Sequence, residues 1–279
     1  QRPRGRPLRA AVCGVDQAAR GWQNQLNMNP QQPTRTHSIP FHGPPWHVLD
    51  NEVQLKQHPG YVQAKSGDVP AAVALITDLA LPFLCRQLLG FAPGCVFVAP
   101  HAREASGDNA IPQVLAETAA LVFDGIADTE IVQATQVFHT GADPMERLAL
   151  RPCFEGDVIA GARYVLVDDV TNLGDTLAEL ADHIQHGGGL VEHALVLVNA
   201  GRNQALKPDK KTLNLIEKRY PNGELTTLFG IANHALTANE ASYLVGFRSV
   251  GEIRNRLAKA RQEIHLRLRS KGIGATHSG

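Results

Sequence analysis

The sequence predicts an α/β protein with an open, mainly parallel sheet flanked by helices, followed by a helical basic appendage at the carboxyl end. Three short apolar runs predict buried strands: "GCVFVAP" (94–100), "RYVLVDD" (163–169) and "VEHALVLVNAG" (191–201). Two amphipathic runs, at 110–123 and 175–186, lie between these strands and predict helices. Because strands that alternate with helices form parallel sheets, the five elements together indicate the fold class.

Other segments flank this core. The apolar run at 69–91 predicts a pair of core helices, and the alternating "YVQAK" (61–65) predicts a short strand. The early residues are rich in Arg, Gln and Pro and show little periodicity, as in a tail. The expected division is a disordered tail (1–35), an N-terminal hood or helical segment (36–93), the α/β core (94–201), a connecting segment (202–235) and the basic appendage (236–279).

Composition excludes several classes of protein. The 27 Lys and Arg residues equal the 27 Asp and Glu residues, so no global charge points to nucleic acid or to a membrane. The four cysteines are scattered and form no C-x-x-C pair, which argues against a zinc site and a disulfide framework. Asp78, Pro82 and Arg86 interrupt the most apolar run, which makes it a poor membrane span. We therefore expect a cytoplasmic protein.

The stretch "VLVDDVTNLGDT" (165–176) carries the clearest chemistry. A turn from a strand into a helix exposes unpaired N–H groups at the positive end of the helix dipole, which suits a phosphate. Asp168 and Asp169 precede the turn and could hold sugar hydroxyls or Mg²⁺, directly or through water. A helix cap beside a solvated acidic pair is the alternative reading. The predicted phosphate loop comprises Thr171, Asn172, Leu173, Gly174, Asp175 and Thr176.

This stretch resembles the phosphoribosyl pyrophosphate (PRPP) signature of type I phosphoribosyltransferases. In that signature a hydrophobic strand precedes two acids, a small apolar residue and a T-T-G-x-T type loop. Asp168 and Asp169 match the acidic pair, while Gly174 and Thr176 match the end of the loop. The stretches "VFVAPHAREASGDNAIPQVLAETAALV" and "GADPMERLALRPCFEGD" are similar to the ComF-like branch of the family. The resemblance covers roughly residues 94–201.

The resemblance implies a transferase that binds PRPP with Mg²⁺ and moves a phosphoribosyl group to or from a nucleobase or nucleotide-type acceptor. Asp168 and Asp169 would hold the ribose hydroxyls and the Mg²⁺ ion. On the pyrophosphate side, the family's loop corresponds to Pro100, His101 and Arg103. A mobile segment would close over the site with His139, Arg147 and Arg151. A homodimer with a role in nucleotide metabolism is expected.

Three residues depart from the family pattern. Asn172 stands where hypoxanthine-guanine phosphoribosyltransferases carry an Asp, and an amide cannot act as a base, which argues against 6-oxopurine salvage. Leu173 replaces a hydroxyl residue, and Asp175 places a negative charge beside the cradle. A catalytically degenerate protein that only binds PRPP or a nucleotide therefore remains an alternative.

The carboxyl-terminal segment contains two capping boxes, Thr237 with Glu240 and Ser249 with Glu252, which predict two helices. Between residues 248 and 271, eight Lys and Arg residues outnumber two Glu residues. Residues 236–271 could therefore contact nucleic acid or a partner protein, or they could pack on the core as a solvated appendage or dimerisation element.

Four early histidines invite a metal-binding interpretation. Their spacing matches no closed ligand pattern, so we predict no metal site among them. They are His37, His42, His47 and His58.

Overall fold

The computed structural model describes residues 33–270 except 87–90, 92, 102–108 and 135–141. Its centre is a five-stranded sheet in the order β1-β7-β6-β2-β3, and every neighbouring pair is parallel. This confirms the predicted open parallel α/β sheet. The strands are β1 (Trp46–Leu49), β2 (Val96–Val98), β3 (Ile126–Ala127), β6 (Arg163–Thr171) and β7 (Leu190–Asn199).

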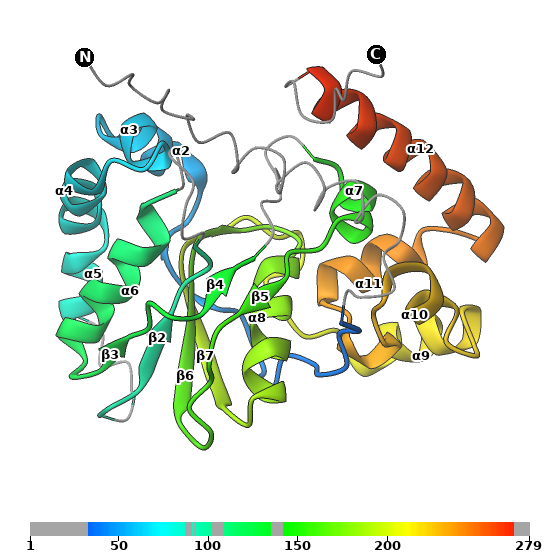
Figure 1. Cartoon of the computed structure of the whole chain (residues 1–279), viewed down its shortest axis with the longest axis horizontal. Coiled ribbons are helices and arrows are strands. Elements are labelled where there is room, and N and C mark those ends of the chain that lie inside the picture. Colours follow the sequence, from blue (N-terminus) through cyan, green and yellow to red (C-terminus); the bar gives the residue numbers. More distant parts are fainter. Residues whose placement is uncertain (1–32, 87–90, 92, 102–108, 135–141, 271–279) are drawn as a thin grey trace, which may run out of the picture.

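Helices cover both faces of this sheet (Figure 1). Side chains alternate along a strand, so Val165 and Val167 of β6 pack on one face while Tyr164 and Leu166 pack on the other. The first face carries five helices and the second carries α8 (Asp175–His186), whose bounds match the prediction. The five are α2 (Glu52–Gln57), α3 (Tyr61–Lys65), α4 (Val69–Leu79), α5 (Leu81–Arg86) and α6 (Ile111–Val122).

A second, smaller sheet lies on the α8 side. It pairs β4 (Val132–Gln133) with β5 (Phe154–Glu155) in antiparallel fashion. Helix α7 (Pro144–Ala149) lies between these strands in the chain and begins with a capping box from Asp143.

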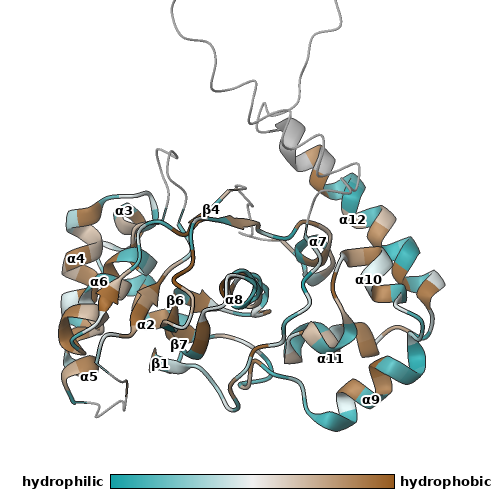
Figure 2. Ribbon diagram, turned by 60° about the horizontal axis from the view of Figure 1, so that its bottom comes forward, coloured by the Kyte–Doolittle hydropathy of each residue, from teal (hydrophilic) through white to brown (hydrophobic). Residues whose placement is uncertain are grey.

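The remaining helices form a C-terminal unit with its own core. This unit joins α9 (Lys210–Arg219), α10 (Glu224–Phe229), the short 3₁₀ helix η1 (Asn233–Ala235), α11 (Ala238–Val245) and α12 (Val250–Ser270). Apolar residues of α9 to α12 pack together with Met145 and Leu148 of α7. Figure 2 shows α8 between the sheet and this unit. The capping box of Thr237 and Glu240 is confirmed.

Several predicted boundaries need correction. "YVQAK" forms helix α3 rather than a strand, because a five-residue run is too short for periodicity to distinguish the two. Residues 202–235 do more than connect, since α9 and α10 supply part of the C-terminal core. The 36–93 segment contributes β1 to the main sheet. Arg35, placed in the expected tail, is fully buried, and the rest of that tail lies outside the described residues except 33 and 34.

The segment from 139 to 151, predicted to be mobile and to close over the site, is helical or buried in its second half. Arg147 belongs to helix α7, and Arg151 is almost fully buried. His139 lies outside the described residues. Packing of α7 against the C-terminal unit, which local sequence did not reveal, accounts for the order of this segment.

The run from Val69 to Arg86 could cross a membrane by length and composition alone. Within the fold it breaks into α4 and α5, and Leu75, Ile76 and Leu84 pack in the core beside the sheet.

Packing of α12 on the C-terminal unit can be tested with two leucines of the same helix. Leu257 is 3% exposed in the unit's core, whereas Leu266 is 65% exposed. We expect Leu257→Ala to lower the free energy of unfolding by about 2–5 kcal/mol, because it removes buried methyl groups and leaves a cavity. Leu266→Ala should change it by less than about 0.5 kcal/mol. Urea denaturation of both variants gives the comparison, and equal effects would contradict the packing of α12.

Candidate functional site

The site begins at the carboxyl end of β6, where the two predicted acidic residues stand. The strand continues two residues beyond the prediction, to Thr171, so Asp168 and Asp169 are still within it. Because side chains alternate along a strand, the two carboxylates point to opposite faces of the sheet. Asp169 lies on the side of helix α3 and Asp168 on the side of α8. They therefore act as two separate groups rather than as a fork.

Asp169 is paired with a cation that the sequence did not reveal. Lys65 Nζ, at the end of α3, lies 2.7 Å from Asp169 Oδ2. Burial disfavours the charge on Lys65, but the attraction and hydrogen bond of Asp169 outweigh burial and raise the pKa of Lys65. Lys65 is more than 100 positions from Asp169 in the chain, and no local pattern signals this contact.

Asp168 is in a different electrostatic position. Among the described residues, no Lys, Arg or His side chain forms a salt bridge with it. Burial and then the neighbouring Asp169 carboxylate raise the pKa of Asp168 well above its usual value, and Lys65 only partly opposes this. An ionised Asp168 therefore favours the approach of a cation or of hydrogen-bond donors such as hydroxyl groups.

The loop after β2 reaches the same edge of the sheet. Val98 of β2 stands opposite Leu166 of β6 in the parallel register, so Pro100 and His101 continue alongside the two acids. The His101 backbone carbonyl accepts a hydrogen bond from the Gln133 amide at 2.7 Å, which ties this loop to β4. Arg103, the third residue predicted for this side, lies outside the described residues.

The turn from β6 into α8 has the shape expected of a cradle. Gly174 has φ +80°, a left-handed conformation that favours glycine, and directly precedes α8. Thr237 Oγ1 donates a hydrogen bond to the Leu173 carbonyl at 2.7 Å, and Asn239 Nδ2 donates one to the Asn172 carbonyl at 3.1 Å. In a trans peptide the N–H points away from the C=O. The amides of Leu173 and Gly174 therefore face away from the C-terminal unit.

Two of the unusual residues of this turn, Leu173 and Asp175, are buried. Leu173 is 6% exposed, and a Cβ on Gly174 would lie within about 3.7 Å of the Leu206 and Thr237 side chains. Asp175 is only 1% exposed, and Arg147 donates to it through Nε at 3.0 Å and through a second guanidinium nitrogen. The Asp175 charge, expected from the sequence to oppose a phosphate, is thus compensated by Arg147. Asn172 is exposed, and Thr176 is half-buried.

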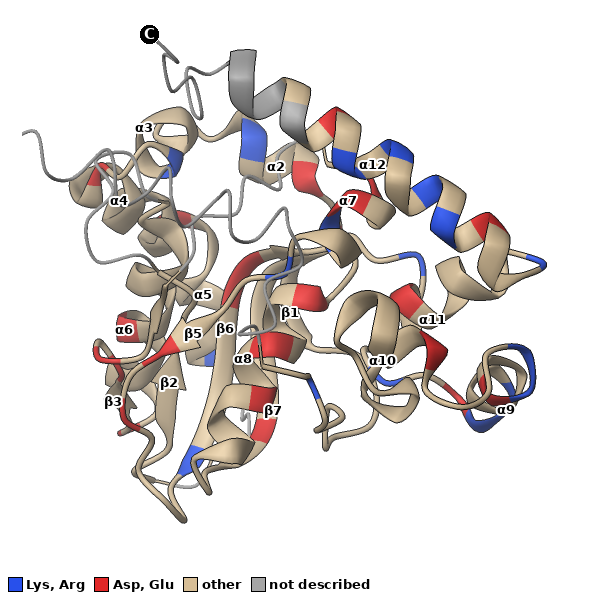
Figure 3. Ribbon diagram, turned by 45° about the vertical axis from the view of Figure 1, so that its right-hand side comes forward, with Lys and Arg blue, Asp and Glu red and all other residues tan. Residues whose placement is uncertain are grey.

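Asp175 is the first of three buried acids on the side of α8 that faces away from the sheet. Asp175, Glu179 and Asp182 are four and three positions apart, so they form one row, which we call the α8 acidic row. Figure 3 shows acidic residues in several turns of α8. Each acid has a basic or imidazole partner from another segment.

Glu179 lies at the centre of this row. Its Oε1 accepts hydrogen bonds from Arg35 at 3.1 Å and from Arg151 at 2.9 Å, while Arg35 also contacts Glu240 of α11. Burial raises the pKa of Glu179, and the two arginines act in the opposite direction. Arg151, predicted to close over a substrate, is therefore part of a buried structural network.

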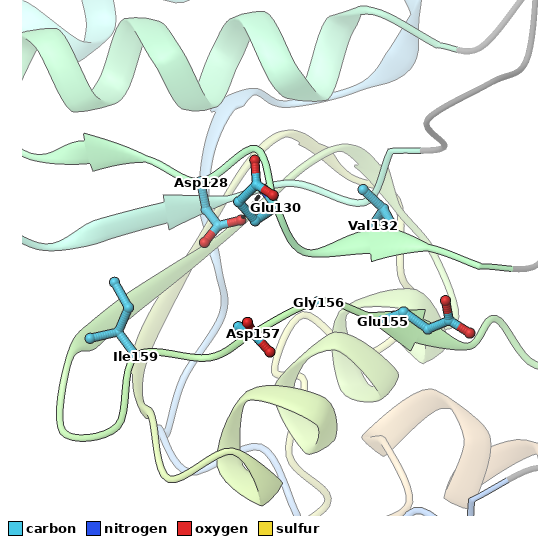
Figure 4. Close-up of a pocket in the computed structure, with 7 residues that line it drawn as sticks. All are labelled: Asp128, Glu130, Val132, Glu155, Gly156, Asp157 and Ile159. Atoms are coloured by element: carbon cyan, nitrogen blue, oxygen red, sulfur yellow. Dashed lines mark hydrogen bonds between the residues drawn. The ribbon is translucent and has the colours of Figure 1, made fainter.

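A separate cavity of about 460 Å³ opens between the β3–β4 connection and the segment after β5 (Figure 4). Four carboxylates line it, those of Asp128, Glu130, Glu155 and Asp157. Carboxylates repel phosphates, so this cavity does not suit an anionic ligand. None of the residues predicted for the site lines it.

Comparison with known proteins gives relatives that are not named as enzymes and one that is a phosphoribosyltransferase. No protein-family model matches the chain. The chain is 37% identical over 217 residues to Protein TraN of Escherichia coli, which covers 75% of this chain and 48% of that protein. It is also 37% identical over 142 residues to an uncharacterized protein of Haemophilus influenzae, covering 49% of this chain and 31% of that protein. The chain thus spans half or less of the length of these relatives.

A third relative is an enzyme. The chain is 28% identical over 127 residues to the orotate phosphoribosyltransferase of Sinorhizobium medicae, covering 40% of this chain and 50% of the enzyme. Among solved structures, an adenine phosphoribosyltransferase of Saccharomyces cerevisiae matches with 13% identity and a TM-score of 0.30, over 66% of this chain and 89% of that one.

The buried pair of Arg147 and Asp175 can be tested against a surface pair. Arg147→Met leaves Asp175 buried without its guanidinium partner and should lower the free energy of unfolding by about 3–5 kcal/mol. Adding Asp175→Leu should restore much of this loss, because no uncompensated charge then remains. Arg163 pairs with Glu192 at the surface, where solvent screens the charges, so Arg163→Met should change the free energy of unfolding far less than Arg147→Met. Chemical denaturation of the three variants would contradict this account if Arg147→Met were as mild as Arg163→Met.

Proposed function

We propose that this protein binds PRPP, or a closely related ribose phosphate, and transfers a phosphoribosyl group to or from a nucleobase or nucleotide-type acceptor. One observation carries the proposal: β6 carries Asp168 and Asp169 near its carboxyl end, and a turn with Gly174 in the left-handed conformation then leads directly into helix α8. Acids for a diol and amides for a phosphate thus stand a few residues apart at the carboxyl edge of a parallel sheet, where ligands of such sheets bind.

The 5′-phosphate is assigned to the turn. The amides of Leu173 and Gly174 face away from the C-terminal unit, and the first amides of α8 add the positive end of the helix dipole. Gly174 is the N-cap residue and has no side chain that could accept hydrogen bonds from the first amides of α8. Arg147 compensates the Asp175 charge, so that charge no longer opposes the phosphate.

The ribose is assigned to the two acids. Asp168 lacks a salt-bridge partner among the described residues, and its carboxylate can accept hydrogen bonds from the ribose hydroxyls. Asp169, paired with Lys65, lies beside Asp168 and would help to hold the same part of the ligand. Hard oxygen ligands of this kind also fit Mg²⁺. Because the two carboxylates point to opposite faces of the sheet, we assign one of Asp168 and Asp169 to direct contact with the ion and the other to contact through water. When bound, Mg²⁺ supplies positive charge that neutralises the pyrophosphate leaving group.

In the reaction, a nitrogen of the acceptor would form a bond to C1 of the ribose while the bond from C1 to the pyrophosphate oxygen breaks. The protein would hold the ribose at its 5′-phosphate and at its hydroxyl groups. It would also place hydrogen-bond donors beside the pyrophosphate, where negative charge increases during the reaction. We assign this role to His101, which follows β2 at the edge of the sheet where the acids lie. We assign the same role, a donor to the pyrophosphate, to Arg103, which lies outside the described residues.

The similarity to an orotate phosphoribosyltransferase supports a transferase of this class. The match covers half of that enzyme, so its acceptor is not carried over to this chain. Asn172 argues against 6-oxopurine salvage, because an amide cannot take a proton from the base. A protein that binds PRPP without transfer is the alternative, and turnover distinguishes the two.

Nucleic-acid association through residues 236–271 remains a prediction, and we do not advance it as a second function. The apolar stripe of α12 packs into the C-terminal unit. Arg256 pairs with Asp143 and Glu263, and Lys259 contacts Glu263, so part of the positive charge is compensated. The side chains of Arg267, Arg269 and Lys271 lie outside the described residues.

Binding can be tested by thermal unfolding with PRPP and Mg²⁺. Saturating ligand at 100 times its Kd should stabilise the wild-type protein by about 2.7 kcal/mol and raise its Tm by several degrees. Asp168→Asn should lose this shift.

The same substitution, Asp168→Asn, should make the unliganded protein more stable by about 1 kcal/mol, because it removes a partly buried charge. That advantage should shrink as the pH falls, since the raised pKa of Asp168 lets the wild-type carboxyl take up a proton.

The control for this experiment is Asp157→Asn in the acidic cavity, which should keep the full PRPP shift. Release of pyrophosphate with a panel of nucleobases then separates a transferase from a binder. A wild-type protein whose Tm is unchanged by PRPP and Mg²⁺ would overturn the proposal, and so would an Asp168→Asn variant that responds fully.

A further inference from the structure

Three potential metal ligands meet at the far end of α8 from the phosphate turn. Asp182 and His186 are one turn apart on α8, and His37 comes from the segment that crosses this helix. His37 Nδ1 lies 3.0 Å from Asp182 Oδ1, and His186 Nδ1 lies 3.2 Å from Asp182 Oδ2. One ligand atom from each residue lies within 4.8 Å of the other two. Within the described residues, this is the group of three such side chains that could hold an ion.

The carboxylate at the centre of this group is held in place. Asp182 is 5% exposed, and its Oδ1 accepts hydrogen bonds from the backbone amides of Thr36 at 2.9 Å and His37 at 2.7 Å. The two imidazoles are more open, with 39% and 50% of their side chains exposed for His37 and His186. Their rings stand edge to face, with centroids 4.4 Å apart. The group therefore combines a fixed anion with two imidazoles that solvent can reach.

We propose that His37, Asp182 and His186 bind a divalent transition-metal ion such as Zn²⁺. Two imidazoles and one carboxylate are ligands that Zn²⁺ uses, and water would fill the fourth position on the exposed side. Ligand atoms around a tetrahedral Zn²⁺ lie about 3.3 Å apart, as follows from metal–ligand distances of about 2.0–2.1 Å. The two nitrogen–oxygen separations, one to each oxygen of the Asp182 carboxylate, are already close to this value. His186 Nδ1 also lies 2.9 Å from the Asp182 carbonyl, and metal binding would replace that hydrogen bond.

Such an ion would fasten the segment of residues 33–37 to α8. This segment also pairs with the C-terminal unit, because Arg35 and Ile231 form a parallel bridge. Arg35 is buried against Glu179 and Glu240 two residues before His37. The metal site would thus close the junction between the core and the C-terminal unit. The proposal does not depend on PRPP binding, because the phosphate turn lies at the other end of α8.

The test is a titration of the full chain with ZnCl₂ by calorimetry, followed by thermal unfolding and by the visible absorption of Co²⁺ as a replacement ion. We expect one equivalent of tight binding, a higher Tm with metal, and the absorption of tetrahedral Co²⁺. His37→Ala and His186→Ala should each weaken this binding by more than the roughly 10- to 100-fold that loss of an outer-shell partner costs. Both variants should leave the PRPP shift in place.

The matched control is His183→Ala, on the same helix. His183 Nε2 contacts the carbonyl of Gly156 instead of Asp182, so this variant should bind Zn²⁺ like the wild-type protein. Circular dichroism without metal shows whether each variant is folded, and the more conservative His37→Gln and His186→Gln replace any that is not. The proposal is overturned if the wild-type chain binds no equivalent of Zn²⁺ or Co²⁺. It is equally overturned if His183→Ala weakens binding as much as the other two variants.

Discussion

The α8 acidic row is the interaction on which the rest of the structure depends. Asp175, Glu179 and Asp182 are each less than 9% exposed, and a buried charge without a partner is strongly destabilising. Their partners come from three places: Arg147 on α7, Arg151 just after it, and the segment containing Arg35 and His37. The burial of α8 therefore depends on segments that are far apart in the chain.

This constraint also shapes the candidate site. The row begins at the first residue of α8, directly after the turn that we assign to phosphate. Arg147 neutralises Asp175, while Thr237 and Asn239 hold the carbonyls of Leu173 and Asn172. Two of the three residues that depart from the phosphoribosyltransferase pattern have a structural role, because Leu173 is buried and Asp175 pairs with Arg147 of α7. The Asn172 side chain is exposed, and the structure gives no reason for its identity.

The sequence predicted the regular part of the fold because local patterns determine it. Apolar runs located β2, β6 and β7, and periodicity located α6 and α8 with nearly correct bounds. The order of strand, acids, glycine turn and helix located the candidate site. Contacts between distant residues left no such signal. Sequence patterns could not reveal three pairings: Lys65 with Asp169, Arg35 with Glu179, and His37 with Asp182. Each of these pairings depends on how segments distant in the chain pack together.

Amide hydrogen exchange in the turn between β6 and α8 tests the central claim most directly. If the phosphate binds as proposed, PRPP with Mg²⁺ should slow exchange at residues 173–176 at least tenfold, and ribose 5-phosphate should slow the same amides. Residues 155–159 beside the acidic cavity should be unaffected. PRPP-dependent protection at the cavity, with unchanged exchange at residues 173–176, would contradict the account.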